Sequence, residues 1–491
     1  MASPGTVLRM VMSVPAALAP PKPLIAYALN TKAPACRTTA ARERVLAILK
    51  DGPPRPGQEL AREAGTGTSV IKGLVEANML IKLALPPAPH FANPDWQAPG
   101  PTLSAEQAAA ATAMRQHVLD GAFLPSVLEG VPGSGKTEGY LEAISEALER
   151  DKQALVLLPE IALSAQWLER FRERFGCAPA LWHSDLTGVQ RRTTWRAVAS
   201  GEAKVIVGAR SALFLPYPDL GVIVIDEEHD GSFKQEEGVV YNARDMGVVR
   251  ASLGGIPVTL VSATPSLETM QNVAKGRYEH FDLPARHGGA ALPDILPVDM
   301  RTAGPDRGKW LSPTLINTLK ETFSRGEQAL LFLNRRGYAP LTLCRACGFR
   351  LQCPQCSTWL VEHRLVGRLQ CHHCGYVAKM PRDCPDCGAE DKLTACGPGV
   401  ERVAEEVDEL FPNIECRIVA SDTLHGPGQA AELVREIESR EIDLLIGTQI
   451  ISKGYHFPYL TLVGVVDADL GLAGGDLRAS ERTYQLLYQV A

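Results

Sequence analysis

Eight cysteines that fall into four Cys-x-x-Cys pairs are the strongest constraint on how this chain can fold. The pairs are Cys344/Cys347, Cys353/Cys356, Cys371/Cys374 and Cys384/Cys387. Two pairs supply the four thiolates of one tetrahedral zinc, so the window predicts two zinc ions. Complete four-thiolate shells leave no open coordination position, which makes the predicted zincs structural. The alternative is a set of reduced thiols without metal. If zinc binds, the four pairs can combine in three ways.

The remaining cysteines show no pair spacing, and they are Cys36, Cys177, Cys396 and Cys416. Thiols used as close pairs indicate metal binding in a reducing compartment, so we expect a cytoplasmic protein without disulfides. No apolar run is long enough to span a bilayer, and Pro15 and Pro20 interrupt the apolar start of the chain. We therefore expect neither a signal peptide nor a membrane partner.

The charge distribution limits how the chain could bind nucleic acid. The formal net charge of the 491 residues is −6, although the first hundred residues are net basic. Local basic faces, rather than the overall charge, would have to hold phosphate groups.

Apolar runs that alternate with helical patterns predict parallel sheets covered by helices. The runs of a first series are residues 126–128, 154–158, 204–207, 222–225 and 258–262, and those of a second are 329–333, 415–419, 443–446 and 462–466. The cysteine pairs lie between the first two runs of the second series. The predicted fold class is α/β, with two RecA-like parallel-sheet lobes and a double zinc-binding insertion in the second lobe.

A different pattern precedes the lobes. Residues 40–50, 57–64 and 69–77 are predicted helices and residues 79–85 a strand, which is a winged-helix pattern. Its third helix carries Lys72, so DNA contact is one interpretation and a protein-contact or spacer domain the other.

These patterns divide the chain into consecutive domains. They are an N-terminal remnant or linker (1–37), a winged helix (38–88), a linker (89–100), an ATP-binding first lobe (101–285), a linker (286–310), the first part of the second lobe (311–340), the zinc insertion (341–392) and the remainder of the second lobe (393–491).

The segment Gly130-Val-Pro-Gly-Ser-Gly-Lys136-Thr137 fits a phosphate loop between a strand and a helix. The predicted nucleotide-binding residues here are Gly130, Gly133, Ser134, Gly135, Lys136 and Thr137. Backbone N–H groups would hold phosphates at the helix N-terminus, Lys136 would reach the β and γ phosphates, and Thr137 would bind Mg²⁺. An ordinary glycine-rich turn is the alternative.

An acidic box follows the buried run at residues 222–225 and reads Asp226-Glu227-Glu228-His229. Open α/β sheets bind ligands at the carboxyl ends of their strands. Asp226 is therefore predicted to hold Mg²⁺ with ATP, Glu227 to polarise the attacking water, and His229 to couple the nucleotide site to its neighbours. A solvated acidic turn is the alternative.

The Asp-Glu-Glu-His box is similar to that of superfamily-two helicases, and the chain resembles the PriA family of bacterial primosomal replication-restart helicases. The segments that carry the resemblance are residues 130–140 (GVPGSGKTEGY), 155–161 (LVLLPEI), 207–216 (VGARSALFLP), 226–230 (DEEHD), 262–269 (SATPSLET), 330–338 (LLFLNRRGY), 447–458 (GTQIISKGYHFP) and 467–472 (DADLGL). The resemblance implies DNA-stimulated ATP hydrolysis, 3′→5′ unwinding and initiation of primosome assembly at stalled forks. Its implied partners are forked or single-stranded DNA, primosome proteins, single-stranded-DNA-binding protein and the replicative helicase loader.

The resemblance also assigns roles to further residues. Gln107 would contact the adenine base. The segment 262–264 would link hydrolysis to lobe movement, while Thr448, Gln449 and Lys453 would lie near the DNA or the cleft between the lobes.

Two more assignments come from the resemblance. Residues 230–243 would form an aromatic-rich loop that couples DNA to hydrolysis, although Phe233 and Tyr241 could equally fill the surface of the lobe. In the zinc insertion, Cys344/Cys347 would share the outer zinc with Cys384/Cys387, and Cys353/Cys356 the inner zinc with Cys371/Cys374.

The sequence departs from the family pattern at Pro132, Tyr455 and Val400, where the family has Thr, His and Thr. We also expect truncation at both ends. About forty residues precede the winged helix, where the family has a domain that captures DNA 3′ ends, and the chain stops before the arginines of the sixth motif. Two competing hypotheses follow: a DNA-binding or primosome-scaffold protein that kept its ATP and zinc sites without turnover, and a related restriction or recombination translocase.

Overall fold

The computed structural model describes the chain apart from residues 1, 21–22, 34–38, 51, 86–89, 160–164, 287–292, 307–308, 334–340, 345, 357–359, 364–367, 372–373, 397–399, 420–426, 448–456, 458, 473–476 and 491. The chain forms two compact units. One contains Met12–Ala92 and Thr187–Ala197, and the other contains Met1–Val11, Asn93–Leu186 and Val198–Ala491. Among the helices formed by the described residues, none has both the length and the apolarity needed to cross a bilayer.

The described residues of the smaller unit form a three-stranded antiparallel sheet and three α-helices within Met12–Ala92, and the unit also includes most of α8 (Gly188–Ala199). The elements are β1 (Leu24–Leu29), α2 (Ala40–Lys50), β2 (Arg55–Pro56), α3 (Gly57–Glu63), α4 (Thr68–Glu76) and β3 (Leu80–Leu85), and the sheet order is β2-β1-β3. Val45, Leu60, Ile71 and Leu74 fill its core. The predicted helices and strand are present, and DNA contact through this unit stays a prediction.

Residues 1–37, expected to be an N-terminal remnant or linker, contain regular structure. This stretch contains α1 (Pro4–Val11) and β1, and β1 pairs with β3 along its whole length. A strand of six residues, Leu-Ile-Ala-Tyr-Ala-Leu, is apolar on both faces and gives no alternating pattern, so its partner far along the chain determines it.

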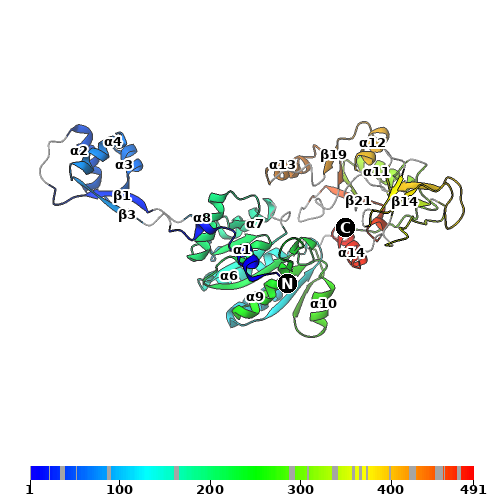
Figure 1. The fold of residues 1–491 in the computed structure, drawn as a ribbon, viewed down its shortest axis with the longest axis horizontal. Helices are drawn as coiled ribbons and strands as arrows, with labels where there is room; N and C mark the ends of the chain where they lie inside the picture. The colour runs from blue at the N-terminus through cyan, green and yellow to red at the C-terminus, as the bar shows by residue number, and fades with distance from the viewer. Residues whose placement is uncertain are drawn as a thin grey trace. The chain divides into compact units, whose positions relative to one another are not determined.

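The first lobe is built on a seven-stranded parallel sheet with the order β12-β4-β11-β8-β5-β7-β6. Figure 1 draws this lobe in cyan and green, with α6, α9 and α10 labelled. The strands are β4 (Pro125–Gly130), β5 (Gln153–Leu157), β6 (Ala180–Trp182), β7 (Val205–Gly208), β8 (Leu220–Asp226), β11 (Val258–Ser262) and β12 (Glu279–Leu283). The helices of this part of the chain are α5 (Ala105–Asp120), α6 (Lys136–Glu149), α7 (Ala165–Phe175), α8 (Gly188–Ala199), α9 (Ala243–Gly254) and α10 (Leu267–Ala274). All five predicted strands are confirmed, and β6 and β12 add one strand at each edge.

The second lobe has a four-stranded parallel sheet with the order β19-β20-β13-β21. Its elements are α11 (Pro313–Ser324), β13 (Gln328–Leu333), α12 (Val400–Leu410), β19 (Cys416–Val419), α13 (Pro427–Glu438), β20 (Leu444–Gly447), β21 (Leu460–Val466) and α14 (Ala479–Val490). Alternate residues of β13 enter different cores: Leu331 packs with Val403 of α12, and Phe332 with Ile437 of α13. Both faces of the sheet are therefore buried, as its unbroken apolar strands require.

The cysteine pairs belong to a separate five-stranded antiparallel sheet with the order β17-β16-β15-β14-β18. Its strands are β14 (Leu341–Cys344), β15 (Val361–His363), β16 (Arg368–Gln370), β17 (Val377–Lys379) and β18 (Leu393–Cys396). In the chain they lie between β13 and β19, the position expected for the insertion. The sheet extends to Cys396, because β18 pairs with β14.

In the second lobe, a buried carboxylate connects α12 to the segment before α11. Glu406, only 4% exposed, accepts hydrogen bonds from the backbone amides of Trp310 at 2.6 Å and Leu311 at 3.3 Å. Glu406→Ala would leave two amides unpaired, at a cost on the order of 2 kcal/mol. We expect these amides to exchange hydrogen about tenfold faster or more, measured by hydrogen-exchange mass spectrometry of peptides that cover residues 309–312.

The matched control is Glu409→Ala, which removes a carboxylate from the same helix. Glu409 forms an exposed ion pair with Lys309 and accepts no backbone bond among the described contacts. Exchange at residues 310 and 311 should stay at the wild-type rate in this variant, and equal acceleration in both variants would contradict the assignment.

Candidate functional site

The phosphate-loop segment connects β4 to α6, and its backbone conformation and close contacts explain why it contains glycines. Gly133 and Gly135 have φ angles of 78° and 77°, in the left-handed region that favours glycine. A Cβ atom at Gly135 would lie 2.2 Å from Nε2 of Gln107, and one at Gly130 would lie 2.5 Å from Oγ of Ser134. The backbone of the loop therefore favours glycine at these positions.

Gln107 contacts the loop through its side-chain amide. Its Nε2 donates to the carbonyl oxygen of Ser134 at 2.7 Å, and its Oε1 accepts from the amide of Ser104 at 2.8 Å. Ser104 and Gln107 form a capping box at the start of α5. The structure thus connects Gln107 to the phosphate loop, while its contact with an adenine base stays a prediction.

Two polar side chains of the loop fit a phosphate ligand. The hydroxyl of Ser134 is buried and has no hydrogen-bond partner among the described residues. The ammonium of Lys136, the first residue of α6, donates to the carbonyl oxygens of Gly130 at 2.8 Å and Val131 at 3.2 Å. Burial lowers the pKa of Lys136, against the raising effect of nearby carboxylates that include Asp226 and Glu227. A buried cation beside N–H groups at a helix N-terminus suits phosphate oxygens.

The acidic box begins where β8, buried over its last six residues, ends. The carboxylate of Asp226 accepts hydrogen bonds from the hydroxyl of Tyr140 at 2.8 Å and from the amide of Glu227 at 2.9 Å. Burial raises the pKa of Asp226 to about 6, and the charge of Glu227 adds to this, while Tyr140 and Lys136 act in the opposite direction. Glu227 has φ 52°, a strained value for a residue with a side chain. The solvated-turn interpretation does not describe this buried site.

His229 connects the box to two other elements. Its Nδ1 lies 2.7 Å from Oγ of Ser262, which also accepts from the amide of Thr264 at 2.9 Å. On the other side of the ring, Nε2 lies 2.7 Å from the amide nitrogen of Gln489, and that nitrogen donates to Glu227 at 3.0 Å. Since Nε2 accepts from an amide, Nδ1 of the neutral ring carries the proton and donates to Ser262.

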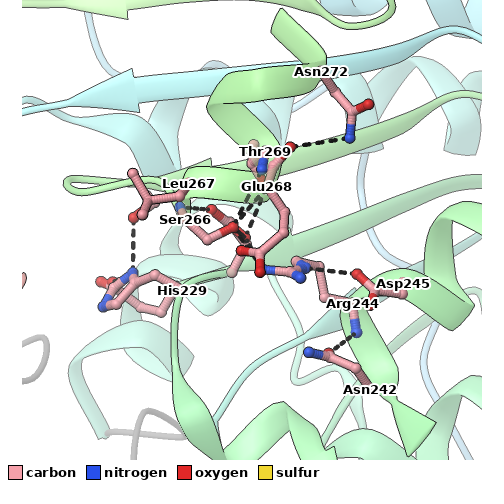
Figure 2. Close-up of polar contacts among 12 residues, drawn as sticks. His229, Asn242, Arg244, Asp245, Ser266, Leu267, Glu268, Thr269 and Asn272 are labelled. Carbon is pink, nitrogen blue, oxygen red and sulfur yellow. Dashed lines mark hydrogen bonds and ion pairs between the residues drawn. The ribbon is translucent and has the colours of Figure 1, made fainter. Parts of the chain in front are cut away.

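Glu228 was assigned no role from the sequence, yet its side chain is fully buried. Its carboxylate accepts from Arg244 at 3.2 Å, from the amide of Ser266 at 2.6 Å and from the hydroxyl of Thr269 at 3.1 Å. Figure 2 shows Arg244, Ser266 and Thr269 meeting in this cluster, with Arg244 also paired to Asp245. The cluster thereby joins the end of β8 to the first residues of α9 and α10. A third acidic residue after an apolar run is the only sequence signal for it.

The proposed aromatic-rich loop contains η4 (Gly231–Phe233) and the hairpin of β9 (Lys234–Gln235) and β10 (Tyr241–Asn242). Phe233 is buried, so it fills the interior of the lobe. The ring of Tyr241 packs against that of Phe214 with centroids 5.2 Å apart, and Lys234 is exposed. Stacking of this segment on DNA bases stays a prediction.

The eight cysteines form two groups of four, Cys344, Cys347, Cys384 and Cys387 in one and Cys353, Cys356, Cys371 and Cys374 in the other. Across the first group, sulfur atoms lie 3.7 Å apart in the pairs Cys344/Cys387 and Cys347/Cys384.

The second group is similarly compact. The corresponding distances are 3.5 Å for Cys353/Cys374 and 3.3 Å for Cys356/Cys371. Tetrahedral zinc with bonds of about 2.3 Å places its sulfurs about 3.8 Å apart, so both groups fit one zinc each. The grouping is the nested one that the family resemblance implies.

Several residues discussed in the sequence analysis lie outside the described residues. These are Cys36, Thr448, Gln449, Lys453 and Tyr455.

Two family models match this chain. Residues 104–273 match the DEAD/DEAH box helicase model, and residues 353–379 match the PriA DNA helicase Cys-rich region domain. Together with the parallel-sheet lobes, the phosphate loop and the cysteine clusters, these matches define a superfamily-two helicase core with a zinc-binding insertion.

Relatives identify the family within this class. Replication restart protein PriA of Rickettsia felis is 49% identical over 390 residues, covering 79% of this chain and 59% of that protein. The protein of the same name from Bacillus subtilis is 38% identical over 461 residues, covering 93% and 57%. A solved structure of RecG bound to a three-way DNA junction has a TM-score of 0.46 and 15% identity, covering 80% of this chain and 41% of that one. The chain belongs to the PriA family, and it spans less than two thirds of the length of the curated relatives that it matches.

The cysteine geometry predicts two zinc ions per chain. Cys384→Ser removes one ligand of the first group and Cys353→Ser one of the second, so each variant should retain about one zinc after purification, and the double variant none. Metal content is measured by atomic emission. Cys177→Ser, which alters a cysteine outside both groups, is the control and should retain two. Two zincs in either single variant would show that its thiol is not a ligand.

Proposed function

We propose that this chain carries the ATP-driven motor of a DNA helicase in replication restart. The observation that supports this most is the close approach of two separate motifs. Asp226 at the end of β8 accepts a hydrogen bond at 2.8 Å from Tyr140 of α6, the helix that begins at Lys136 of the phosphate loop. The charges of Asp226 and Glu227 act to raise the pKa of the Lys136 ammonium, against the larger lowering effect of burial. Hydrolysis of a nucleoside triphosphate needs a cation that binds the phosphates. Beside it, the reaction needs carboxylates that bind a metal ion and activate a water.

Each proposed catalytic group has a position that suits its role. Lys136 and the N–H groups at the start of α6 would bind the β and γ phosphates, and the buried hydroxyl of Ser134 adds an unused hydrogen-bonding group there. The oxygens of Thr137 and Asp226 would hold Mg²⁺, which prefers such ligands. When bound, Mg²⁺ would neutralise phosphate charge during hydrolysis.

Glu227 would accept a proton from the attacking water. The amide of Gln489 donates to its carboxylate at 3.0 Å. His229 contacts the same amide and Ser262, so it is placed to relay changes at the carboxylates to β11 and α14. We propose that this relay couples hydrolysis to movement of the motor on DNA.

The proposed substrates and partners follow from family membership. The motor would translocate 3′→5′ on single-stranded DNA, act at forked DNA and initiate primosome assembly, in the cytoplasm. Primosome proteins, single-stranded-DNA-binding protein and the replicative helicase loader are the proposed partners, and the zinc insertion, whose metals are structural, is a proposed contact surface for them. Support comes from relatives that are named replication restart proteins.

Glu227→Gln should separate nucleotide binding from turnover. The variant keeps the shape of the side chain but loses the proton acceptor, so we expect kcat for ATP to fall on the order of a hundredfold or more with nucleotide affinity nearly unchanged. Lys136→Ala should weaken nucleotide binding as well. ATP turnover is measured with and without single-stranded DNA, and affinity with a fluorescent nucleotide.

Glu173→Gln is the control, because Glu173 is an exposed carboxylate on α7 of the same lobe and has no proposed role in the site. It should turn over like the wild type. Wild-type protein that binds nucleotide, DNA and two zincs but hydrolyses no ATP in the presence of DNA would contradict the motor proposal and leave the scaffold hypothesis in its place.

A further inference from the structure

Tyr140 is a buried tyrosine on α6 whose hydroxyl contacts a side chain proposed to hold Mg²⁺. The residue is 0% exposed. Its hydroxyl donates to Oδ2 of Asp226 at 2.8 Å and accepts from Nε1 of Trp167 at 2.7 Å.

The chemistry of these groups fixes the direction of every bond. A phenol oxygen has one proton to donate and two lone pairs to accept with. Indole Nε1 can only donate and an ionised carboxylate can only accept, so the Tyr140 proton goes to Asp226. Each of the two hydrogen bonds therefore has only one possible direction.

Packing holds the phenol in place. The indole of Trp167 stacks on the ring of Phe171 with centroids 5.6 Å apart and an interplanar angle of 18°, and Phe171 packs on Phe175. All three rings belong to α7 and are buried in the core of the first lobe, where Tyr140 also packs. The hydroxyl of Tyr140 is thus oriented by a rigid partner from a different helix.

The carboxylate of Asp226 is oriented from both of its oxygens. Oδ2 accepts from Tyr140, while Oδ1 accepts from the amide of Glu227 at 2.9 Å. The hydrogen bond from the backbone amide is local, and any residue at position 227 except proline would donate it. The bond to Tyr140 spans 86 positions of sequence and requires a hydroxyl at that place. A simple packing role would need only an aromatic ring.

We propose that Tyr140 is a positioning residue for the divalent metal of the nucleotide site, orienting the carboxylate of Asp226, and that Trp167 fixes the orientation of Tyr140. The inference rests on the proposed ATP-hydrolysing function. It adds that a hydroxyl from α6 sets the position of the metal-binding carboxylate at the end of β8.

Tyr140→Phe tests the proposal because it removes the hydroxyl and keeps the ring. Groups that orient metal ligands typically change metal affinity by 10- to 100-fold. We expect Mn²⁺ affinity in the presence of a non-hydrolysable ATP analogue, measured by electron paramagnetic resonance titration, to fall about tenfold or more. Affinity for the same analogue in EDTA should be unchanged, and added Mg²⁺ should restore part of the lost kcat.

Tyr217→Phe is the matched control. The hydroxyl of Tyr217 donates to the carbonyl oxygen of Ala212 at 3.0 Å in the same lobe, away from both proposed metal ligands. This variant also loses one intramolecular hydrogen bond, so a general loss of stability would affect both variants alike. Its Mn²⁺ affinity should match that of the wild type.

Trp167→Phe is a second test that does not change Tyr140. It keeps an aromatic ring on Phe171 but removes the donor that orients the phenol, so Mn²⁺ affinity should fall less than in Tyr140→Phe, by a few-fold. This variant also keeps the proposal testable where Tyr140→Phe does not fold.

The outcomes separate the two levels of the argument. Wild-type Mn²⁺ affinity in Tyr140→Phe, or in Trp167→Phe alone where the first variant does not fold, would overturn the inference and leave the proposed function intact. An equal loss of analogue affinity in EDTA would also overturn it, because the hydroxyl would then support the phosphate loop in general. Wild-type protein that binds neither the analogue nor Mn²⁺ with it would overturn the proposed function itself.

Discussion

The proposed nucleotide site depends on the hydrogen bonds made by four consecutive polar residues at the end of β8. Each of the four side chains is hydrogen-bonded to a different part of the protein. Asp226 is bonded to α6, Glu227 to α14, Glu228 to the first residues of α9 and α10, and His229 to β11. The strand before them is buried in the centre of a seven-stranded sheet, so its end cannot shift without moving its neighbours. Any change at one of these residues is therefore felt by the elements that the other three hold.

The buried pair of Glu228 and Arg244 shows how much this arrangement costs and how that cost is offset. Charges without a partner are expensive in a protein interior, and removing one member of a buried pair typically costs about 3–5 kcal/mol. Here the carboxylate is matched by a guanidinium and by donors from Ser266 and Thr269, which leaves none of its oxygens without a bond. Because these bonds mainly offset the cost of burying the charges, the pair adds little net stability. Its effect is to hold the starts of α9 and α10 against the end of β8.

Long apolar strands could be predicted from the sequence, and short or mixed ones could not. β8 and β13 are unbroken apolar runs that a buried parallel strand requires, so their positions were found. β6 has three residues, and β12 reads Glu-His-Phe-Asp-Leu at the edge of the sheet, where exposed polar side chains hide the pattern. Their place is determined by pairing with neighbours distant in the chain, which no local window contains.

The same division applies to the site. The phosphate loop and the acidic box are contiguous motifs, and their residue types follow from local chemistry. By contrast, the contact of Tyr140 with Asp226 joins residues 86 positions apart, and its contact with Trp167 joins residues 27 apart. A tyrosine on an apolar helix face is indistinguishable in sequence from an ordinary core residue. Only the folded lobe shows that its hydroxyl is used.

The zinc insertion illustrates why a metal-bound segment can interrupt a lobe without disturbing its parallel sheet. β14 and β18, the first and last strands of the insertion, are antiparallel neighbours, so the chain leaves and returns at adjacent points. The outer cysteine group lies next to these two strands in sequence, since Cys344 ends β14 and Cys384/Cys387 precede β18, and a zinc there would close the module at its base. The inner group closes a shorter loop within the first. β13 and β20 pair directly in parallel, so the insertion interrupts the chain but not the sheet of the second lobe.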